Sequence, residues 1–171
     1  MDLIEGYLAG DHDCFEEIVL SYRKDAEAFA YKLLFDRYAA QDVVQDAFVS
    51  LYLQRKKYNK KYALKTYLFT IVRRRCIDYI RKQSRVYLTD DFIIETHESP
   101  ETVLLHKEKK ESIIKAFNEI KKPYQMAIYL VDSEGLSYKE AAKIMDMSLS
   151  GFKVTLMRAR KHFKLQLEGV L

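Results

Sequence analysis

Residues 64–83 of this chain read LKTYLFTIVRRRCIDYIRKQ. Large apolar side chains recur in it every three or four positions, which is the spacing of one face of an α-helix. The remaining positions hold three consecutive arginines, Arg73 to Arg75, and one acid, Asp78. The stretch therefore predicts a helix with one face for packing and a basic face for a negatively charged partner.

The positive charge extends to both sides of this helix. Residues 55–85 hold twelve lysines and arginines against a single acid, while residues 1–54 have a net charge of −7 and residues 86–137 one of −4. A second basic block, residues 138–171, has a net charge of +4. Five aromatic rings lie within the first block: Tyr58, Tyr62, Tyr67, Phe69 and Tyr79. Dense positive charge mixed with aromatic rings is typical of surfaces that bind single-stranded nucleic acid.

Composition favours an all-α fold. The chain has 171 residues, a hydrophobic fraction of 49%, five glycines and two prolines, and helical spacing of apolar residues nearly throughout. We predict two small helical domains, residues 1–84 and 100–171, joined by a linker at 85–99. Residues 36–38 are expected to connect two helices. The expected helices are about 12–35, 39–54, 64–83, 100–120, 124–134, 138–145 and 150–167.

The sequence lacks the residues that several classes of function require. Cys14 and Cys76 are isolated, and the four histidines are scattered, so neither a metal site nor a cofactor is expected. No paired acid and base, nucleophile or phosphate-binding glycine loop is visible, so no catalytic residues are expected. The acidic N-terminus is no signal peptide, and no apolar run is long enough for a bilayer. We expect a soluble protein of the cytoplasm with no direct membrane insertion.

The helix expected at 39–54 has two different faces. Its core face combines Val43, Val44, Ala47, Phe48 and Leu51. The opposite face mixes two acids and an amide with two aliphatic side chains: Asp42, Gln45, Asp46, Val49 and Leu53. One interpretation is an ordinary solvated face; the other is a docking surface for a basic, partly apolar partner helix. Periodicity alone leaves both open.

Residues 56–62 form the loop before the basic helix and contain four lysines. Packing of the protein does not require these lysines. The loop suits a single strand, because lysines can contact phosphates while Tyr58 or Asn59 contacts an unstacked base. The basic helix continues this surface with Tyr67, Arg73 and Arg81. The alternative is a solvated basic face in which Asp78 pairs with a neighbouring arginine.

Residues 136–154 predict a helix–turn–helix. Ser137 and Glu140 have the spacing of a capping box, and the small pair Ala141-Ala142 allows two helices to cross closely. The following helix would insert its N-terminal end into the major groove. A generic helical hairpin is the alternative.

These motifs resemble a known family. Residues 42–48 (DVVQDAF), 65–74 (KTYLFTIVRR) and 77–82 (IDYIRK) look like the second conserved domain of bacterial RNA polymerase sigma factors of the small extracytoplasmic-function type. Residues 136–142 (LSYKEAA) and 157–160 (MRAR) are similar to the fourth conserved domain. The chain departs from the family pattern at Tyr67, where tryptophan is usual, and at Arg74, where asparagine is usual. The second departure leaves the role of Arg74 open.

The resemblance implies three sets of site residues. Those implied to bind the clamp helices of the polymerase β′ subunit are Asp42, Gln45, Asp46, Val49 and Leu53, whereas Phe48 is expected in the core. Those implied to recognise and melt the minus-ten element are Tyr58, Asn59, Lys60, Tyr67, Arg73, Arg74, Arg81 and Lys82. Those implied to read the minus-35 element are Ser148, Ser150, Gly151, Lys153, Arg158, Arg160 and Lys161. The fourth domain is also implied to contact the β flap.

The expected function is therefore that of a sigma factor, not an enzyme. It would bind core RNA polymerase and promoter DNA in the bacterial cytoplasm, associated with the nucleoid through the polymerase, under control of an anti-sigma factor. A stand-alone helix–turn–helix regulator would explain residues 136–164 only. An enzyme acting on nucleic acid would need carboxylates clustered beside the basic helix, where Asp78 is the single acid.

Overall fold

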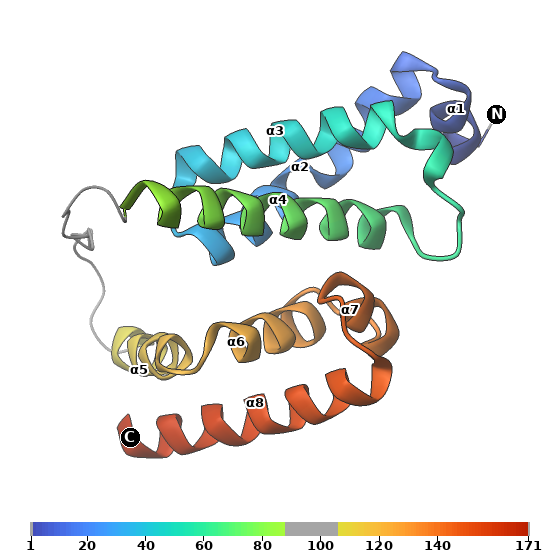
Figure 1. Cartoon of the computed structure of the whole chain (residues 1–171). Coiled ribbons are helices and arrows are strands. Elements are labelled where there is room, and N and C mark those ends of the chain that lie inside the picture. Colours follow the sequence, from blue (N-terminus) through green and yellow to red (C-terminus); the bar gives the residue numbers. More distant parts are fainter. Residues whose placement is uncertain (1, 88–105, 171) are drawn as a thin grey trace. The chain divides into compact units, whose positions relative to one another are not determined.

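A computed structural model of the chain describes residues 2–87 and 106–170, and every regular element within them is helical (Figure 1). The chain forms two compact units, the first built from helices α1 to α4 and the second from α5, α6, α8 and most of α7. The predicted all-α fold with two helical domains is confirmed. The linker predicted at 85–99 lies outside the described residues except for its first three, which belong to α4.

The first unit begins with a helix that the periodicity did not indicate, α1 (Leu3–Ala9). Gly10 ends it with a φ of +92°, a conformation that favours glycine. A helix of this length is not stable alone. Its buried Tyr7 donates a hydrogen bond to the Leu51 carbonyl oxygen at 2.7 Å, so tertiary contacts hold α1 in place.

Two long helices follow, each started by an aspartate. Helix α2 (His12–Leu34) begins after Asp11, whose carboxylate accepts from the Cys14 amide. Helix α3 (Arg37–Leu53) begins after Asp36, which accepts from the amides of Tyr38 and Ala39 at 2.9 and 3.0 Å. The connection predicted at 36–38 is therefore wrong. Asp36 acts as an N-cap and the next two residues form the first turn.

The basic segment after α3 begins with a short 3₁₀-helix, η1 (Arg55–Lys57), and leads into α4 (Leu64–Tyr87). Helix α4 contains residues 64–83, with which the sequence analysis began, and runs four residues beyond the predicted end. Phe69, which was grouped with the basic surface, is fully buried. Its ring stacks on Phe29 of α2, with centroids 4.6 Å apart and planes 7° apart. Phe69 is therefore a core residue of the first unit.

Three helices of the first unit share this core. α2, α3 and α4 each turn one apolar face inward, as the periodicity predicts. The fully buried residues of this core include Ile18, Ala26, Ala30, Val44, Ala47, Leu51, Leu68, Val72 and Cys76.

The second unit contains α5 (His106–Glu119), α6 (Lys122–Ile128), α7 (Tyr138–Ile144) and α8 (Leu149–Val170). The predicted helix start at Pro100 lies outside the described residues. The helix predicted at 124–134 begins two residues earlier and ends in a π-helical turn, η2 (Tyr129–Ser133). Gly135 follows with a φ of +66°. The buried residues of this unit include Ala116, Met126, Ala127, Leu130, Ala141, Ala142, Phe152, Leu156 and Ala159.

Candidate docking and nucleic-acid interfaces

The outer face of α3 is exposed along its whole length. Val49 is 57% and Leu53 72% exposed, although both are large aliphatic side chains. Asp42, Gln45 and Asp46 are exposed beside them, while the opposite face of α3 is buried in the core. A helix that leaves aliphatic side chains in water between acids has the composition of a docking surface. We call these five residues the α3 face.

Tyr38 extends the α3 face by one turn. It precedes Asp42 by four residues and Gln45 by seven, so it points the same way, and it is 80% exposed. Sequence reasoning missed Tyr38 because residues 36–38 were assigned to a connection. The signal was Asp36, whose position as an N-cap places the first turn of the helix two residues earlier.

The loop after α3 is ordered by its own polar groups. The Tyr58 hydroxyl donates to the Tyr62 carbonyl oxygen at 2.7 Å, and the Lys61 amide donates to Oδ1 of Asn59 at 3.1 Å. Lys60 has a φ of +56° at the tip of the turn. Burial, and secondarily the charge of Tyr22, raises the pKa of Tyr58. The hydroxyl therefore stays protonated and keeps its hydrogen bond at neutral pH.

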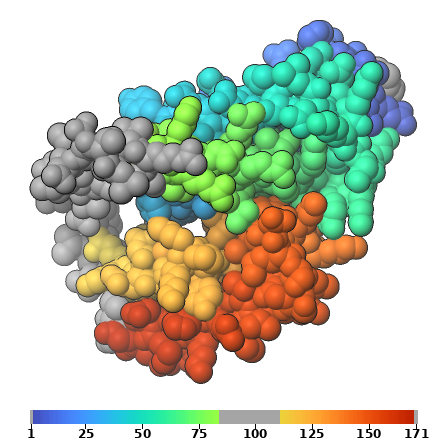
Figure 2. Space-filling model, in the orientation of Figure 1, coloured from blue at the N-terminus to red at the C-terminus, as the bar shows by residue number. Residues whose placement is uncertain are grey.

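The loop meets the start of α4 through aromatic contact. The rings of Tyr58 and Tyr67 lie 5.3 Å apart, and both side chains are half-buried. Asn59 and Lys60 are exposed. Two tyrosine rings in tilted contact and two exposed polar residues thus form one continuous feature, which joins two parts of the predicted minus-ten set. Figure 2 shows α3 and the adjoining loop on the visible face of the first unit.

The basic face of α4 includes only some of its cations. Arg74, Arg81 and Lys82 are exposed, and Arg73 is half-buried. Arg75 is also exposed, but it donates to Ser50 Oγ of α3 at 2.5 Å. Arg74 and Arg81 are seven residues apart and therefore lie on one side of the helix.

Two cations of the basic block support the structure of the first unit. Lys65 pairs with Asp25 of α2 at 2.7 Å. Arg55 donates to the Tyr52 carbonyl oxygen at 3.0 Å and lies over the Tyr52 ring. Its Nε atom is buried and has no hydrogen-bond partner among the described residues. Charge density along the sequence therefore overstates the positive charge that the surface presents.

The helix–turn–helix of the second unit has the predicted capping box. The Ser137 amide and hydroxyl both donate to Glu140 Oε2, at 3.0 and 2.8 Å, and the Glu140 amide donates back to Ser137 Oγ at 3.2 Å. At the other end of α7, Asp146 has a φ of +55°. The chain then turns into α8, which Ser148 caps by accepting from the Gly151 amide at 3.1 Å.

The exposed face of α8 contains most of the predicted minus-35 residues. Ser150, Lys153, Arg158 and Lys161 are exposed, and Gly151 is half-buried under Ser148. Sequence reasoning missed two apolar members of this face, Val154 and Met157, which are 43% and 64% exposed. The missed signal is their spacing of four and seven residues from Ser150.

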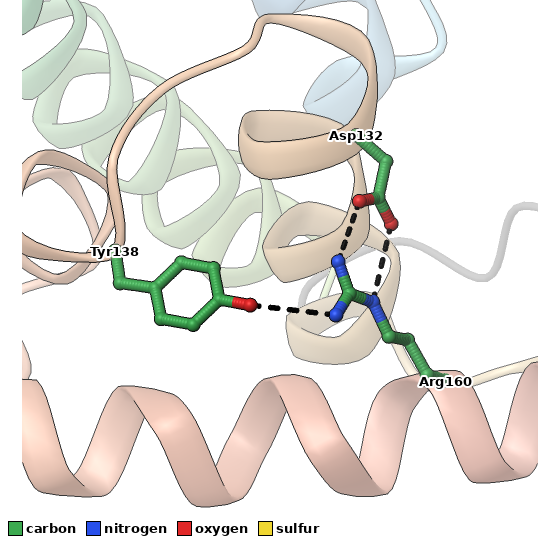
Figure 3. A network of polar contacts seen from close by, with 3 residues as sticks. All are labelled: Asp132, Tyr138 and Arg160. Carbon is green, nitrogen blue, oxygen red and sulfur yellow. Dashed lines mark hydrogen bonds and ion pairs between the residues drawn. The ribbon is translucent and has the colours of Figure 1, made fainter.

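Arg160 differs from its neighbours on α8. Its guanidinium donates to both carboxylate oxygens of Asp132, with Nη2 to Oδ1 at 2.6 Å and Nε to Oδ2 at 3.4 Å. Nη1 also reaches the Tyr138 hydroxyl at 3.5 Å (Figure 3). The hydrogen bond to Asp132, followed by that to Tyr138, raises the pKa of Arg160 above its ordinary value. We call these three residues the Arg160 bracket.

Within residues 2–87 and 106–170, no three histidine, cysteine, aspartate or glutamate side chains gather as a metal site would require. No helix in the same residues has the length and apolar character needed to cross a membrane.

A helical unit with a docking face and a basic aromatic loop, followed by a helix–turn–helix unit, defines a DNA-binding transcription factor of two domains. Family models agree with this class. The chain matches Sigma-70 region 2 over residues 18–86 and Sigma-70, region 4 over residues 110–163. A lone helix–turn–helix regulator is not favoured, because it would leave the first match unexplained.

Similar proteins give the same result. The ECF RNA polymerase sigma factor SigM of Bacillus subtilis is 32% identical over 151 residues, which cover 87% of this chain and 92% of SigM. The ECF RNA polymerase sigma-E factor of Escherichia coli K12 is 27% identical over 175 residues, covering 93% of this chain and 89% of that protein. Among solved structures, the sigma factor RpoE of Bartonella quintana, crystallised with the anti-sigma factor NepR, is 26% identical. It superposes with a TM-score of 0.73, covering 90% of this chain and 96% of RpoE.

This chain belongs to the ECF sigma factors of the sigma-70 family. Its function is to direct the initiation of transcription at particular promoters.

Proposed function

We propose that the α3 face binds core RNA polymerase, at the clamp helices of the β′ subunit. The composition of the face supports this: Val49 and Leu53 supply apolar area, while Asp42 and Asp46 can complement a basic partner helix. Tyr38 adds an aromatic side chain at one end, and tyrosine is enriched among residues that dominate binding energy. The exposure of these aliphatic side chains is the observation that carries the assignment.

The loop at 58–62 and the basic face of α4 would bind the minus-ten element as separated strands. Tyr58 and Tyr67 offer ring faces and edges for stacking, and Asn59 and Lys60 offer exposed polar groups at the tip of the loop. Arg73, Arg74, Arg81 and Lys82 would contact phosphates. The free energy for opening the duplex would come from tighter binding to melted than to paired DNA, not from a catalysed reaction, and the protein would act without enzymatic activity.

Helix α8 would read the minus-35 element from the major groove. Lys153, Arg158 and Lys161 are placed for phosphates or base edges, and Ser150 lies in the first turn, which enters deepest. Val154 and Met157 give this face an apolar strip that suits the methyl group of thymine. The same unit is proposed to contact the β flap of the polymerase.

Regulation is inferred from similar proteins. RpoE of Bartonella quintana was crystallised with an anti-sigma factor, and we infer that an anti-sigma factor also controls this chain. A factor that works on polymerase and promoter DNA acts in the bacterial cytoplasm, at the nucleoid.

In vitro transcription with core polymerase tests the proposal. We expect start sites that arise only when this protein is added, found by sequencing the transcripts. The absence of any such site with active core enzyme would contradict the function. A gel shift on the promoters found should show weak binding by the free protein, because tight binding without polymerase would favour a stand-alone regulator.

The docking assignment has its own test. Asp46→Arg should abolish co-purification with core polymerase, because it places a cation against a basic partner. The matched control is Glu16→Arg, which reverses an exposed acid on α2. Circular dichroism should show that both variants are folded. Equal co-purification of the two variants would show that the α3 face does not bind the polymerase.

A further inference from the structure

The Arg160 bracket joins three elements of the second unit. Asp132 lies in the π-helical turn η2, Tyr138 is the first residue of α7, and Arg160 lies in the third turn of α8. Figure 3 shows the guanidinium between the carboxylate and the phenol. A guanidinium held at both carboxylate oxygens has a fixed direction as well as a fixed position.

Tyr138 contacts α8 at two points. Its ring lies 6.1 Å from the ring of Phe152 in the first turn, and its hydroxyl accepts from Arg160 eight residues further on. Eight residues along a helix correspond to about 12 Å. One tyrosine side chain at the start of α7 thus contacts two turns of α8, directly at Phe152 and through the extended side chain of Arg160.

The Arg160 bracket spans the turn between η2 and α7. Gly135 has a φ of +66°, and a side chain added there would meet no atom within 4 Å. The Leu136 amide also donates to the Leu130 carbonyl oxygen at 3.1 Å across this turn, so backbone and side-chain contacts together hold the two elements. Exposed ion pairs usually contribute little to stability, and the side chains of Arg160 and Asp132 are 47% and 43% exposed. We therefore expect the bracket to affect orientation more than folding.

We propose that Arg160 is a positioning residue for promoter recognition: bound to Asp132 and Tyr138, it fixes how α8 is presented to the minus-35 duplex. This inference rests on the proposed function of α8. It assigns phosphate binding to Arg158 and Lys161 and removes Arg160 from that set. Arg158 is exposed and has no hydrogen bond or ion pair with another described residue. Arg158 and Arg160, which are separated only by Ala159, thus have different roles.

Charge reversal in the full-length chain distinguishes the two roles. The probe is a duplex carrying the upstream element of a promoter found by the transcription assay, bound by the reconstituted holoenzyme. Asp132→Arg and Arg160→Asp alone should each weaken binding about tenfold, a coupling typical of residues in one network. The double variant restores the pair with its charges exchanged, so binding should return to within about threefold of the unchanged protein.

A phosphate contact predicts the opposite pattern. Asp132→Arg would then strengthen binding by adding a cation, and the double variant would stay as weak as Arg160→Asp. Either result would overturn the proposal. Arg158→Asp is the matched control. It should weaken binding to the intact and the scrambled minus-35 duplex alike, and Asp132→Arg should not rescue it.

Two further readouts separate positioning from folding. Loss of positioning should lower the ratio of binding to intact over scrambled minus-35 duplex, measured well below the unfolding temperature of each variant. A structural role alone would lower the unfolding temperature and leave this ratio unchanged. If a charge reversal fails to fold, Asp132→Asn and Arg160→Gln give the same comparison, and their effects should not add. If the unchanged protein yields no start sites, the proposed function is contradicted. The positioning role of Arg160 is contradicted only if the unchanged protein is active and the variants do not show the expected pattern.

Discussion

Gly10 occupies a position that favours glycine. Its φ of +92° is costly for any residue with a side chain, and an added Cβ would lie 2.9 Å from the Arg55 guanidinium. Arg55 in turn packs on Tyr52 and fixes the start of the basic loop. One glycine thus allows the α1–α2 turn to approach the segment that positions Tyr58.

Gly10→Ala should destabilise the protein by about 2 kcal/mol, from backbone strain together with the displaced arginine. Gly135→Ala has the strain but no neighbour, and should cost about 1 kcal/mol. Gly169→Ala, near the end of α8, meets nothing and should be neutral or slightly stabilising. Urea unfolding followed by circular dichroism measures all three. A smaller loss at position 10 than at position 135 would contradict this account of the turn.

The buried thiol of Cys76 lowers the stability of the folded protein at alkaline pH. Burial in the first core raises the pKa of its thiol from 9.0 to about 12. Between these values the unfolded chain loses a proton that the folded chain keeps, so stability falls as pH rises, by about 1.4 kcal/mol per pH unit. Below pH 9 this contribution is fully present.

Cys76→Ala removes this titration and should flatten the decline in stability between pH 9 and pH 12. The free energy of unfolding, measured by urea titration at several pH values, provides the test. Tyr7, whose pKa burial also raises, leaves a residual slope above pH 10. An unchanged slope in the variant would mean that the thiol does not titrate as its burial implies.

At the scale of elements, the start of α3 decides the extent of the docking face. Asp36 caps this helix by accepting from two amides, which places Tyr38 on the same side as Asp42. The apolar spacing alone predicts a later start. Helix ends depend on one or two hydrogen bonds, whereas the body of a helix repeats its pattern many times, so boundaries are the least determined part of a sequence.

Asp36→Ala should cost about 1 kcal/mol through loss of the cap, whereas Asp36→Asn should cost little because asparagine also caps well. Affinity for core polymerase should fall in the alanine variant and not in the asparagine variant, since Tyr38 would leave the face when the first turn frays. Thermal unfolding and a polymerase pull-down measure the two effects. Equal affinity of both variants would exclude Tyr38 from the docking face.

At the scale of the whole molecule, the charge is divided between two helical units. The first presents acids on α3 and cations on the loop and α4, and the second presents cations on α8. Under the proposed function, this division lets one chain bind a protein with one surface and nucleic acid with two others. Positive charge spread uniformly over the chain would bind DNA without this separation of tasks.

Arg73→Ala with Arg74→Ala should reduce promoter opening by about tenfold or more, because two phosphate contacts to the separated strands are lost. Binding to core polymerase should stay within about twofold, since neither residue lies on the α3 face. Opening is measured by the fluorescence of an unstacked base analogue in the minus-ten element. The double variant Arg23→Ala with Lys24→Ala removes the same charge from α2 and should open promoters normally. Equal losses of opening and polymerase binding would contradict the assignment.

The sequence by itself determined the helical class, the two-domain organisation, the core and outer faces of α3, and the capping box of α7. These depend on local spacing and on hydrogen bonds between near neighbours, which a linear pattern contains. Only the tertiary structure decided that Phe69 stacks on Phe29, that Arg55 and Arg75 serve the protein's own framework, and that Arg160 is held by Asp132. Each of these partners lies at least 25 residues away along the chain or in another element. A cation in a sequence looks the same whether it reaches water or a distant carboxylate, and folding alone decides which.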